Sequence, residues 1–196
     1  LVSKVHRESE QLHRNGYDIL LIGEIRDGET ADIAVKFALT GHLVFSTVHA
    51  NDAPGTITRL LDIGIAPFLV GSCLNLVMAQ RLVRRICLNC KESYTPSREE
   101  LDLVGLDPGK VKGDLFQGKG CADCRNTGYK GRLAIFEMIP MARELRKLVF
   151  DSANEDDIRE SALKNGMITL REAGLSRVLE GITTVEEIVR STVEDL

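Results

Sequence analysis

Four of the five cysteines have the spacing of metal ligands. Cys87 and Cys90 form one Cys-x-x-Cys pair, and Cys121 and Cys124 form a second pair after 30 intervening residues. Four thiolates close a tetrahedral shell around zinc, and each two-residue spacer lets one tight turn present two sulfurs to the same ion. Because such a shell leaves no open coordination position, the spacing predicts a structural zinc site.

Other uses of the cysteines stay open at this point. An iron–sulfur cluster would also take four thiolates, and the visible absorbance of the purified protein would reveal it. Two unrelated pairs, or one redox pair, would need no metal. The fifth cysteine, Cys73, stands apart in an apolar segment, where we expect a buried and unreactive thiol.

An acidic residue follows a short apolar run near the start of the chain. Residues 19–22 read Ile-Leu-Leu-Ile, which predicts a strand buried on both faces of a parallel sheet, and Gly23 and Glu24 come next. Proteins of the α/β class place ligands at the carboxyl ends of such strands, where a carboxylate can orient water or Mg²⁺ contacts during phosphate hydrolysis. Many strands also end in glutamate because the carboxylate is well solvated, so spacing alone leaves both interpretations of Glu24 open.

Further polar residues surround the next predicted strand. His42 precedes this strand, and Ser46, Thr47 and His49 gather at its carboxyl end. If the two strands are neighbours, the same edge rule brings this end close to Glu24. Hydroxyls and an imidazole there could contact a γ-phosphate or its attacking water. The local alternative is that the hydroxyls satisfy backbone groups and that His49 opens a turn.

The sequence predicts that helices alternate with these strands. Asp27 and Asp52 stand where the N-cap residues of the first two helices are expected. This order of elements is typical of the α/β class, in which helices cover a mostly parallel sheet. The predicted elements are, in order, a strand at 19–22, a helix at 29–40, a strand at 43–47, a helix beginning near Pro54 and a helix at 67–80.

The rest of the chain is expected to form a polar lobe and a helical end. Glycine and polar residues dominate 87–131, so we expect little apolar core there and a lobe that folds around its metal, which contributes an apparent ~10–16 kcal/mol in zinc peptides. A strand at 133–139 and a series of helices follow. Thr184 with Glu187, or the pair one residue earlier, has capping-box spacing for the last helix. The predicted segments are therefore 1–86, 87–131 and 132–196.

Length and composition limit the classes of function. The 196 residues allow one substantial domain, with or without a satellite, at roughly 100–200 residues per domain. With 28% charged residues, no apolar run near the ~20 residues that span a bilayer and no signal segment, the sequence predicts a soluble, cytosolic protein. A formal net charge of −4 and the lack of tryptophan argue against nucleic acid as the partner of the whole domain.

In this order, the motifs resemble a known family. Residues 18–27, the string Thr30-Ala-Asp-Ile-Ala and the string Leu39-Thr-Gly-His-Leu-Val-Phe-Ser-Thr-Val-His49 closely resemble the Walker B and histidine-box regions of the ATPases that drive type II secretion and type IV pilus assembly, the GspE and PilB group. Residues 79–87 resemble the segment that leads into this group's tetracysteine subdomain. The resemblance covers nearly the whole chain, and its tetracysteine lobe indicates the assembly and secretion branches rather than the pilus-retraction branch.

The resemblance implies an ATP-driven motor with a RecA-like P-loop NTPase core. Residues 1–86 would be the carboxy-terminal part of its ATPase domain, 87–131 a zinc-binding subdomain, and 132–196 a carboxy-terminal strand and helical subdomain. The parent would be a Mg²⁺-dependent ATPase that forms a homo-hexameric ring on the cytoplasmic side of the inner membrane. Its cofactors would be Mg-ATP and structural zinc, and its partners would be inner-membrane platform proteins of a secretion or pilus machine.

The resemblance also assigns roles to individual residues. Glu24 matches the Walker B glutamate that supports Mg²⁺ and activates water. His42 and His49 match the catalytic histidine-box residues, with His49 the better placed to report the γ-phosphate. Arg26 and Arg81 match motif arginines and would contact the nucleotide.

The sequence departs from the family in two places. A phosphate-binding Gly-x-x-x-x-Gly-Lys-Ser/Thr loop is absent from it, which fits an N-terminally truncated piece, so we expect this chain alone to bind ATP poorly and to be inactive. Before Walker B, Arg14 and Asp18 match the usual Leu-Arg-x-x-Leu-Arg-x-Asp-Pro-Asp pattern. Glu10, Gly16 and Tyr17 stand where Arg, Asp and Pro are usual.

Two other functions compete with the motor. The first is a zinc-stabilised, non-catalytic module that docks a membrane-platform partner. The second is a zinc-ribbon nucleic-acid binder, which the net acidity disfavours and which salt-dependent DNA binding would support. In the motor, Arg84 and Arg85 would form a nucleotide or subunit contact or merely a solvated basic face. The basic residues of the nucleic-acid alternative would be Arg81, Arg84, Arg85 and Lys91.

Overall fold

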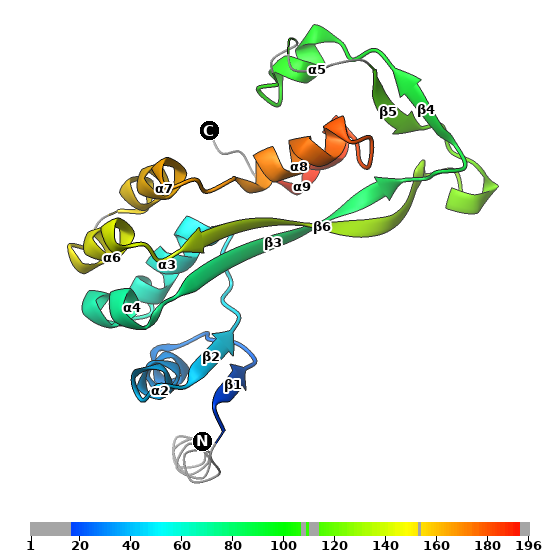
Figure 1. Cartoon of the computed structure of the whole chain (residues 1–196). Coiled ribbons are helices and arrows are strands. Elements are labelled where there is room, and N and C mark those ends of the chain that lie inside the picture. Colours follow the sequence, from blue (N-terminus) through cyan, green and yellow to red (C-terminus); the bar gives the residue numbers. More distant parts are fainter. Residues whose placement is uncertain (1–16, 107–108, 110–113, 153, 193–196) are drawn as a thin grey trace. The chain divides into compact units, whose positions relative to one another are not determined.

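The computed structural model describes residues 17–106, 109, 114–152 and 154–192, so residues 1–16, with the departures at Glu10 and Gly16, lie outside it. Packing divides the chain into two units. Figure 1 labels their helices and strands and colours the ribbon along the sequence. The first unit comprises the described part of Leu1–Val77 together with Ile139–Gly166, and the second comprises that of Met78–Met138 and Met167–Leu196. Helices and strands occur in both, so the predicted mixed α/β class is confirmed.

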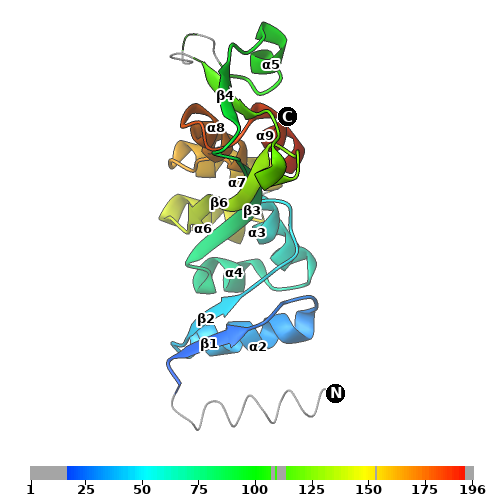
Figure 2. The ribbon, with the colours of Figure 1, turned by 90° about the vertical axis from the view of Figure 1, so that its right-hand side faces the viewer.

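The first unit begins with two parallel strands joined by a helix. Strand β1 (Ile19–Ile22) pairs with β2 (Leu43–Ser46), and helix α2 (Gly28–Leu39) lies alongside both (Figure 2). Asp27 caps α2 by accepting a hydrogen bond of 2.8 Å from the Thr30 N–H, as its position in the sequence predicts. The parallel register places the carboxyl ends of both strands at the same edge.

One face of this pair of strands is exposed, so the expectation of a strand buried on both faces is wrong for the part of the chain described. Leu20 is buried, whereas its neighbours in β1, Ile19 and Leu21, are 61% and 80% exposed. Opposite them in β2, Leu43 and Phe45 are exposed as well. The physical reason is that successive strand residues point to opposite faces and that α2 covers one of them.

The described part of the first unit has four further helices. Helix α3 is capped by Asp52, which accepts a hydrogen bond of 2.8 Å from the Gly55 N–H. Helix α4 packs against α6, and α7 packs against both α3 and α6. The bounds are Ala53–Asp62 for α3, Pro67–Cys73 for α4, Arg143–Phe150 for α6 and Glu155–Lys164 for α7.

The helix predicted at 67–80 is wrong beyond Cys73. Leu74 has an extended backbone, with ψ at 129°, and strand β3 (Leu76–Ile86) follows. The reason is tertiary, because β3 is half of a long two-stranded sheet with β6 (Tyr129–Pro140), which also extends the strand predicted at 133–139. Cys73 itself is half-buried rather than buried. Burial raises the pKa of its thiol, and the charge of Arg146 opposes that rise.

The described part of the second unit packs a small antiparallel sheet, three α-helices and part of the β3–β6 sheet around one core. Its core includes Leu101 and Leu115 from 87–131, so this segment contributes more apolar core than its composition suggests. Val178 and Ile188 from the last two helices pack in the same cluster. The bounds are Lys91–Tyr94 for β4, Arg98–Asp102 for α5, Leu115–Gly118 for β5, Ala122–Cys124 for the 3₁₀ helix η2, Leu170–Leu179 for α8 and Val185–Ser191 for α9.

The helical end of the chain is confirmed by α6 to α9. Packing groups residues 139–166 with the first unit and residues 167–192 with the second. The two packing units therefore do not follow the order of the sequence. The division of the chain into three segments stays a prediction. Among the residues that the structure describes, no helix is both long enough and apolar enough to cross a bilayer.

Candidate functional site

The carboxyl ends of β1 and β2 are held together beyond the sheet itself. The Thr47 hydroxyl donates a hydrogen bond of 2.7 Å to the Gly23 carbonyl, and the Ile25 N–H donates one of 2.9 Å to the Thr47 carbonyl. The first bond agrees with the alternative given above, in which the Thr47 hydroxyl satisfies a backbone group. These two bonds fix the backbone on both sides of Glu24.

Glu24 carries the charged contacts at this edge. One carboxylate oxygen contacts Nε2 of His49, and the other contacts Nε of Arg26. The Glu24 side chain is 21% exposed, whereas His49 is 84% and Arg26 is 74% exposed. The structure therefore brings together three of the predicted site residues, a half-buried carboxylate with a solvent-facing imidazole and a solvent-facing guanidinium. Such a group can hold a water molecule and accept its proton.

His42 lies at the other end of β2. Its ring packs edge-on against Phe37, with 5.3 Å between ring centroids, and its Nδ1 lies 3.2 Å from the Phe37 carbonyl oxygen and 3.0 Å from the Thr40 hydroxyl. The four residues of β2 lie between it and Thr47, which are therefore five residue steps apart, or about 17 Å at the usual rise of about 3.3 Å per residue. The structure thus does not bring His42 to Glu24 and His49.

A second ionic contact fixes the chain shortly after His49. Asp52, the N-cap of α3, accepts a hydrogen bond of 2.8 Å from Arg159 of α7, and Arg159 also contacts Glu155 at 2.9 Å. The Thr58 hydroxyl donates to Glu155 at 3.1 Å. Sequence reasoning missed Arg159, because 107 residues separate it from Asp52 and no local pattern links the two.

Arg81, Arg84 and Arg85 all lie on β3, in the second unit. Arg81 is half-buried and Arg85 is exposed. Arg84 lies over the Tyr129 ring, 4.0 Å from its centroid, and its Nε and Nη2 contact Glu187 at 2.7 Å and 2.6 Å. Arg84 is therefore part of a folded polar cluster rather than a solvated basic face.

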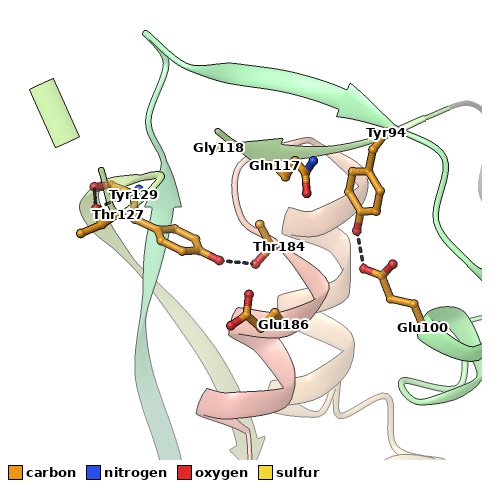
Figure 3. Close-up of a pocket in the computed structure, with 8 residues that line it drawn as sticks. All are labelled: Tyr94, Glu100, Gln117, Gly118, Thr127, Tyr129, Thr184 and Glu186. Atoms are coloured by element: carbon orange, nitrogen blue, oxygen red, sulfur yellow. Dashed lines mark hydrogen bonds between the residues drawn. The ribbon is translucent and has the colours of Figure 1, made fainter. Parts of the chain in front are cut away.

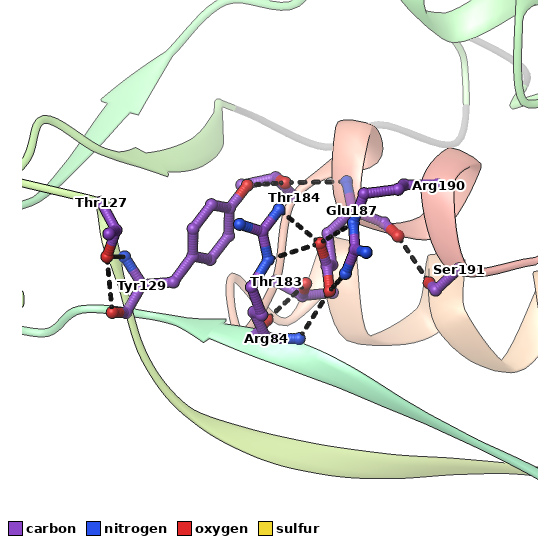
Figure 4. Close-up of polar contacts among 8 residues, drawn as sticks. All are labelled: Arg84, Thr127, Tyr129, Thr183, Thr184, Glu187, Arg190 and Ser191. Atoms are coloured by element: carbon purple, nitrogen blue, oxygen red, sulfur yellow. Dashed lines mark hydrogen bonds and ion pairs between the residues drawn. The ribbon is translucent and has the colours of Figure 1, made fainter.

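Glu187 is the centre of this cluster, and its side chain is fully buried (Figure 4). It accepts hydrogen bonds from the Arg84 N–H at 2.9 Å and from Nη2 of Arg190 at 2.7 Å. Burial alone would raise the pKa of Glu187, but the hydrogen bonds from Arg190 and Arg84 outweigh it and lower the pKa to about 2. Thr184 caps α9 by accepting from the Glu187 N–H at 3.2 Å. The capping-box spacing correctly located the start of this helix. The Glu187 side chain, however, binds Arg84 and Arg190.

The four paired cysteines form one cluster. Their sulfurs all lie within 4.8 Å of one another, with 3.9 Å between Cys87 and Cys121, 3.8 Å between Cys90 and Cys124, and 3.7 Å between Cys121 and Cys124. Sulfurs that surround one zinc ion tetrahedrally at about 2.3 Å are about 3.8 Å from each other. The donor set and spacing therefore fit a single four-coordinate metal ion.

Backbone N–H groups favour the thiolate form of Cys124, which is the form that binds a metal ion. Although burial disfavours the thiolate, N–H groups of Cys121 and Gly128 donate to the Cys124 sulfur at 3.2 Å and 3.3 Å and lower its pKa to about 6. The Gly128 carbonyl also accepts from the Cys87 N–H at 2.9 Å. A side chain at Gly118 would bring its Cβ to 2.1 Å from that carbonyl oxygen, so the close approach of the two backbones requires glycine there.

Comparison with known proteins places this chain in one family. The family model described as type II/IV secretion system protein matches residues 7–190. The chain is 47% identical to the type IV pilus assembly ATPase PilB of Myxococcus xanthus over 184 residues, which covers 93% of this chain and 32% of that protein. It is 45% identical to the type II secretion system protein E of Pseudomonas aeruginosa over 182 residues, covering 93% and 36%. The chain thus spans about a third of the length of these curated relatives.

Solved structures show the same fold at low sequence identity. The pilus retraction motor PilT with bound ADP aligns with a TM-score of 0.65 at 20% identity, over 96% of this chain and 43% of that one. The Legionella pneumophila ATPase DotB aligns with a TM-score of 0.61 at 17% identity, over 92% and 40%. With a family model matched along nearly its entire length, this chain belongs to the family of type II/IV secretion system proteins.

Proposed function

We propose that this chain is the carboxy-terminal part of the ATPase of a type II secretion or type IV pilus assembly machine. In this proposal, ATP hydrolysis by the parent is coupled to protein export or to assembly of a pilus or pseudopilus. The observation that supports it best is the contact between Glu24 and His49 at the shared carboxyl edge of β1 and β2. Relatives at 47% and 45% identity are named as an ATPase and as a secretion protein, which supports the same assignment.

Glu24 is the proposed Walker B glutamate. Its half-buried carboxylate would support a Mg²⁺ contact and accept a proton from the attacking water. His49 would orient the Glu24 carboxylate or contact the γ-phosphate and so sense its presence. When bound, ATP would supply the phosphoryl group that is transferred, and Mg²⁺ would supply the positive charge that neutralises the phosphate oxygens. Arg26, 74% exposed beside Glu24, is available to contact phosphate oxygens. The phosphate-binding loop, absent from this sequence, would be supplied by the rest of the parent.

The proposal assigns separate roles to His42 and Arg81. Because His42 braces the start of β2 through Phe37, we propose that it acts through the strand as a positioning residue. Arg81 lies in the other packing unit, and its proposed nucleotide contact rests on the family resemblance alone.

The wider assembly is also part of the proposal. The exposed apolar face formed by Ile19, Leu21, Leu43 and Phe45 is what a strand pair from the middle of a larger RecA-like sheet would present. The parent would act as a homo-hexamer on the cytoplasmic face of the inner membrane, in contact with platform proteins. The four cysteines would hold a structural zinc ion.

A non-catalytic docking module remains the second candidate, because the sequence lacks a phosphate-binding loop. One experiment separates the two. In the full-length parent, Glu24→Gln should keep nucleotide affinity, measured with a fluorescent ATP analogue, and lower phosphate release by about 10²-fold or more, the scale typical of general-base loss. Glu29→Gln, an acidic residue of the first turn of α2, is the matched control and should hydrolyse normally. Undiminished turnover by Glu24→Gln would refute the Walker B assignment of Glu24, and an unmodified parent that releases no phosphate would favour the docking module over the motor.

A further inference from the structure

A pocket of about 260 Å³ lies in the second unit (Figure 3). It is bordered by two hydrogen bonds, from the Tyr94 hydroxyl to Glu100 and between the hydroxyls of Tyr129 and Thr184 at 2.7 Å. None of its residues belongs to the proposed nucleotide site or to the cysteine cluster. The pocket is lined by Tyr94, Glu100, Gln117, Gly118, Thr127, Tyr129, Thr184 and Glu186.

Two carboxylates contribute negative charge to this pocket. Glu100 comes from α5 and Glu186 from the first turn of α9. Within the described residues, no ion pair is formed by either of them. Other glutamates of the same unit do have cationic partners, since Glu92 pairs with Lys119 and Glu187 with two arginines. Charge in the pocket is thus left to be neutralised from outside.

Nearby cations do not remove this charge. Hydrogen bonds to Glu187 are the main cause that raises the pKa of Arg190, and the charge of Glu186 adds least to that rise. The Arg190 nitrogens bind Glu187 at 2.7 Å and 3.0 Å. The negative charge of Glu186 helps to raise the pKa of Tyr129, and that of Glu100 helps to raise the pKa of Tyr94, in both cases after burial as the main cause. Both tyrosines are therefore held neutral.

The remaining lining favours a long cation with an apolar stem. The ring of Tyr94 offers aromatic surface, which attracts cations, whereas the Tyr129 ring already has the guanidinium of Arg84 4.0 Å from its centroid. Gln117 contributes an amide oxygen as a further acceptor. The volume lies below the roughly 300–1,000 Å³ of sites for drug-sized ligands. It suits a single side chain.

We propose that this pocket binds one basic side chain, an arginine or a lysine, of a partner protein. Charge complementarity with Glu100 and Glu186 is the basis of recognition, and the Tyr94 ring covers the alkyl stem. Arginine is the better fit, because its planar guanidinium can meet carboxylates in a fixed geometry while it stacks on an aromatic ring. The proposal is independent of ATP hydrolysis, because it uses no residue of the nucleotide site.

The test is an NMR titration of the ¹⁵N-labelled, zinc-loaded chain with N-acetyl-arginine amide, N-acetyl-lysine amide and the neutral N-acetyl-citrulline amide. We expect saturable shifts at the amides of Tyr129, Thr184 and Glu186 with the two cations and none with the citrulline derivative. Glu186→Gln and Glu100→Gln should each weaken binding about threefold to fivefold, the scale of an exposed ion pair. Glu180 lies in the same unit but pairs with Arg177 outside the pocket, so Glu180→Gln should bind the two cations as tightly as the unmodified chain does.

Three results would overturn the proposal. The first is the absence of saturable shifts at the pocket amides while the spectrum remains that of a folded chain. The second is equal binding by the citrulline derivative or by Glu186→Gln. The third is tighter binding of putrescine than of either capped amino acid, which would assign the pocket to a free amine instead of a protein side chain.

Discussion

His49 contacts the carboxylate of Glu24 through its Nε2 atom, so the imidazole that follows β2 meets the acid that follows β1. Parallel pairing produces this contact, because Ile22 lies opposite Ser46 and both chains leave the sheet at the same edge. The hydrogen bond from Thr47 to Gly23 then limits how far the two strand ends can separate.

This contact predicts that Glu24 and His49 act as a unit in the full-length parent. His49→Gln should lower the hydrolysis rate strongly in the unmodified parent but much less when Glu24→Gln is already present, because residues that act together are not additive. Steady-state phosphate release from the two single variants and the double variant measures the coupling. Fully additive losses would mean that the two side chains work independently.

Asp52 has two functions that substitution can separate. Asp52→Asn keeps a good N-cap on α3 but removes the charge that pairs with Arg159, whereas Asp52→Ala loses both. We expect Asp52→Ala to lower the free energy of unfolding, measured in urea, by about 1 kcal/mol more than Asp52→Asn does. Asn154→Ala, which removes the cap of α7, is the matched control and should also cost about 1 kcal/mol. Equal losses for the two Asp52 variants would contradict a capping role.

Local signals explain what the sequence predicted well. Asp27 and Asp52 were identifiable as caps because each acts on an N–H three residues away. The cysteine cluster was identifiable because two short spacers fix the geometry of each pair, and only the meeting of the pairs depends on the fold.

Long-range contacts explain what the sequence could not predict. The segment Leu76–Ile86 has apolar residues that fit a helix as well as a strand, and its pairing with β6 decides the outcome. The Arg84–Glu187 and Arg159–Asp52 contacts join residues 103 and 107 positions apart. The approach of Glu24 to His49 could be predicted, because the carboxyl ends of neighbouring parallel strands lie at the same edge of a sheet. The distance of His42 from both residues follows from the length of β2, which the structure gives as Leu43–Ser46.

Loss of one cysteine should release the metal and loosen a defined part of the chain. Cys121→Ser is expected to lower bound zinc from one ion per chain to near zero, because a three-thiolate shell with serine binds the ion far less well. Trypsin should then cut within 87–131, and α8 and α9 should loosen too, since Leu101 and Leu115 share their core. Strands β1 and β2, which belong to the other packing unit, should keep their protection.

Cys73→Ser is the matched control for this experiment, because Cys73 lies in α4, outside the cluster. It should retain one zinc ion per chain, measured by elemental analysis, and the protease resistance of the unmodified chain. Unchanged zinc content in Cys121→Ser would refute a four-cysteine site. Strong visible absorbance with iron in place of zinc would replace zinc with an iron–sulfur centre.

Glu187 predicts a specific dependence of stability on pH. Its pKa is about 2 in the folded chain and near the ordinary glutamate value of 4.5 when unfolded. A lowered folded-state pKa means that the stabilisation is complete above pH 4.5 and is lost as the pH falls from there towards 2. At neutral pH this difference corresponds to about 3 kcal/mol, at about 1.4 kcal/mol per pKa unit. Glu187→Gln should therefore be less stable at pH 7 by that order, because Arg84 and Arg190 lose their shared carboxylate.

The pH profile distinguishes this charge effect from a simple packing loss. The difference in the free energy of unfolding between the unmodified chain and Glu187→Gln, measured by urea titration, should be constant from pH 7 to 5 and shrink below pH 4.5. Loss of metal at low pH affects both chains, so their difference isolates the carboxylate. Glu180→Gln removes the exposed pair with Arg177 and should change stability by less than about 1 kcal/mol at every pH. A Glu187→Gln difference that stays constant down to pH 3 would mean that Glu187 contributes through its shape and not its charge.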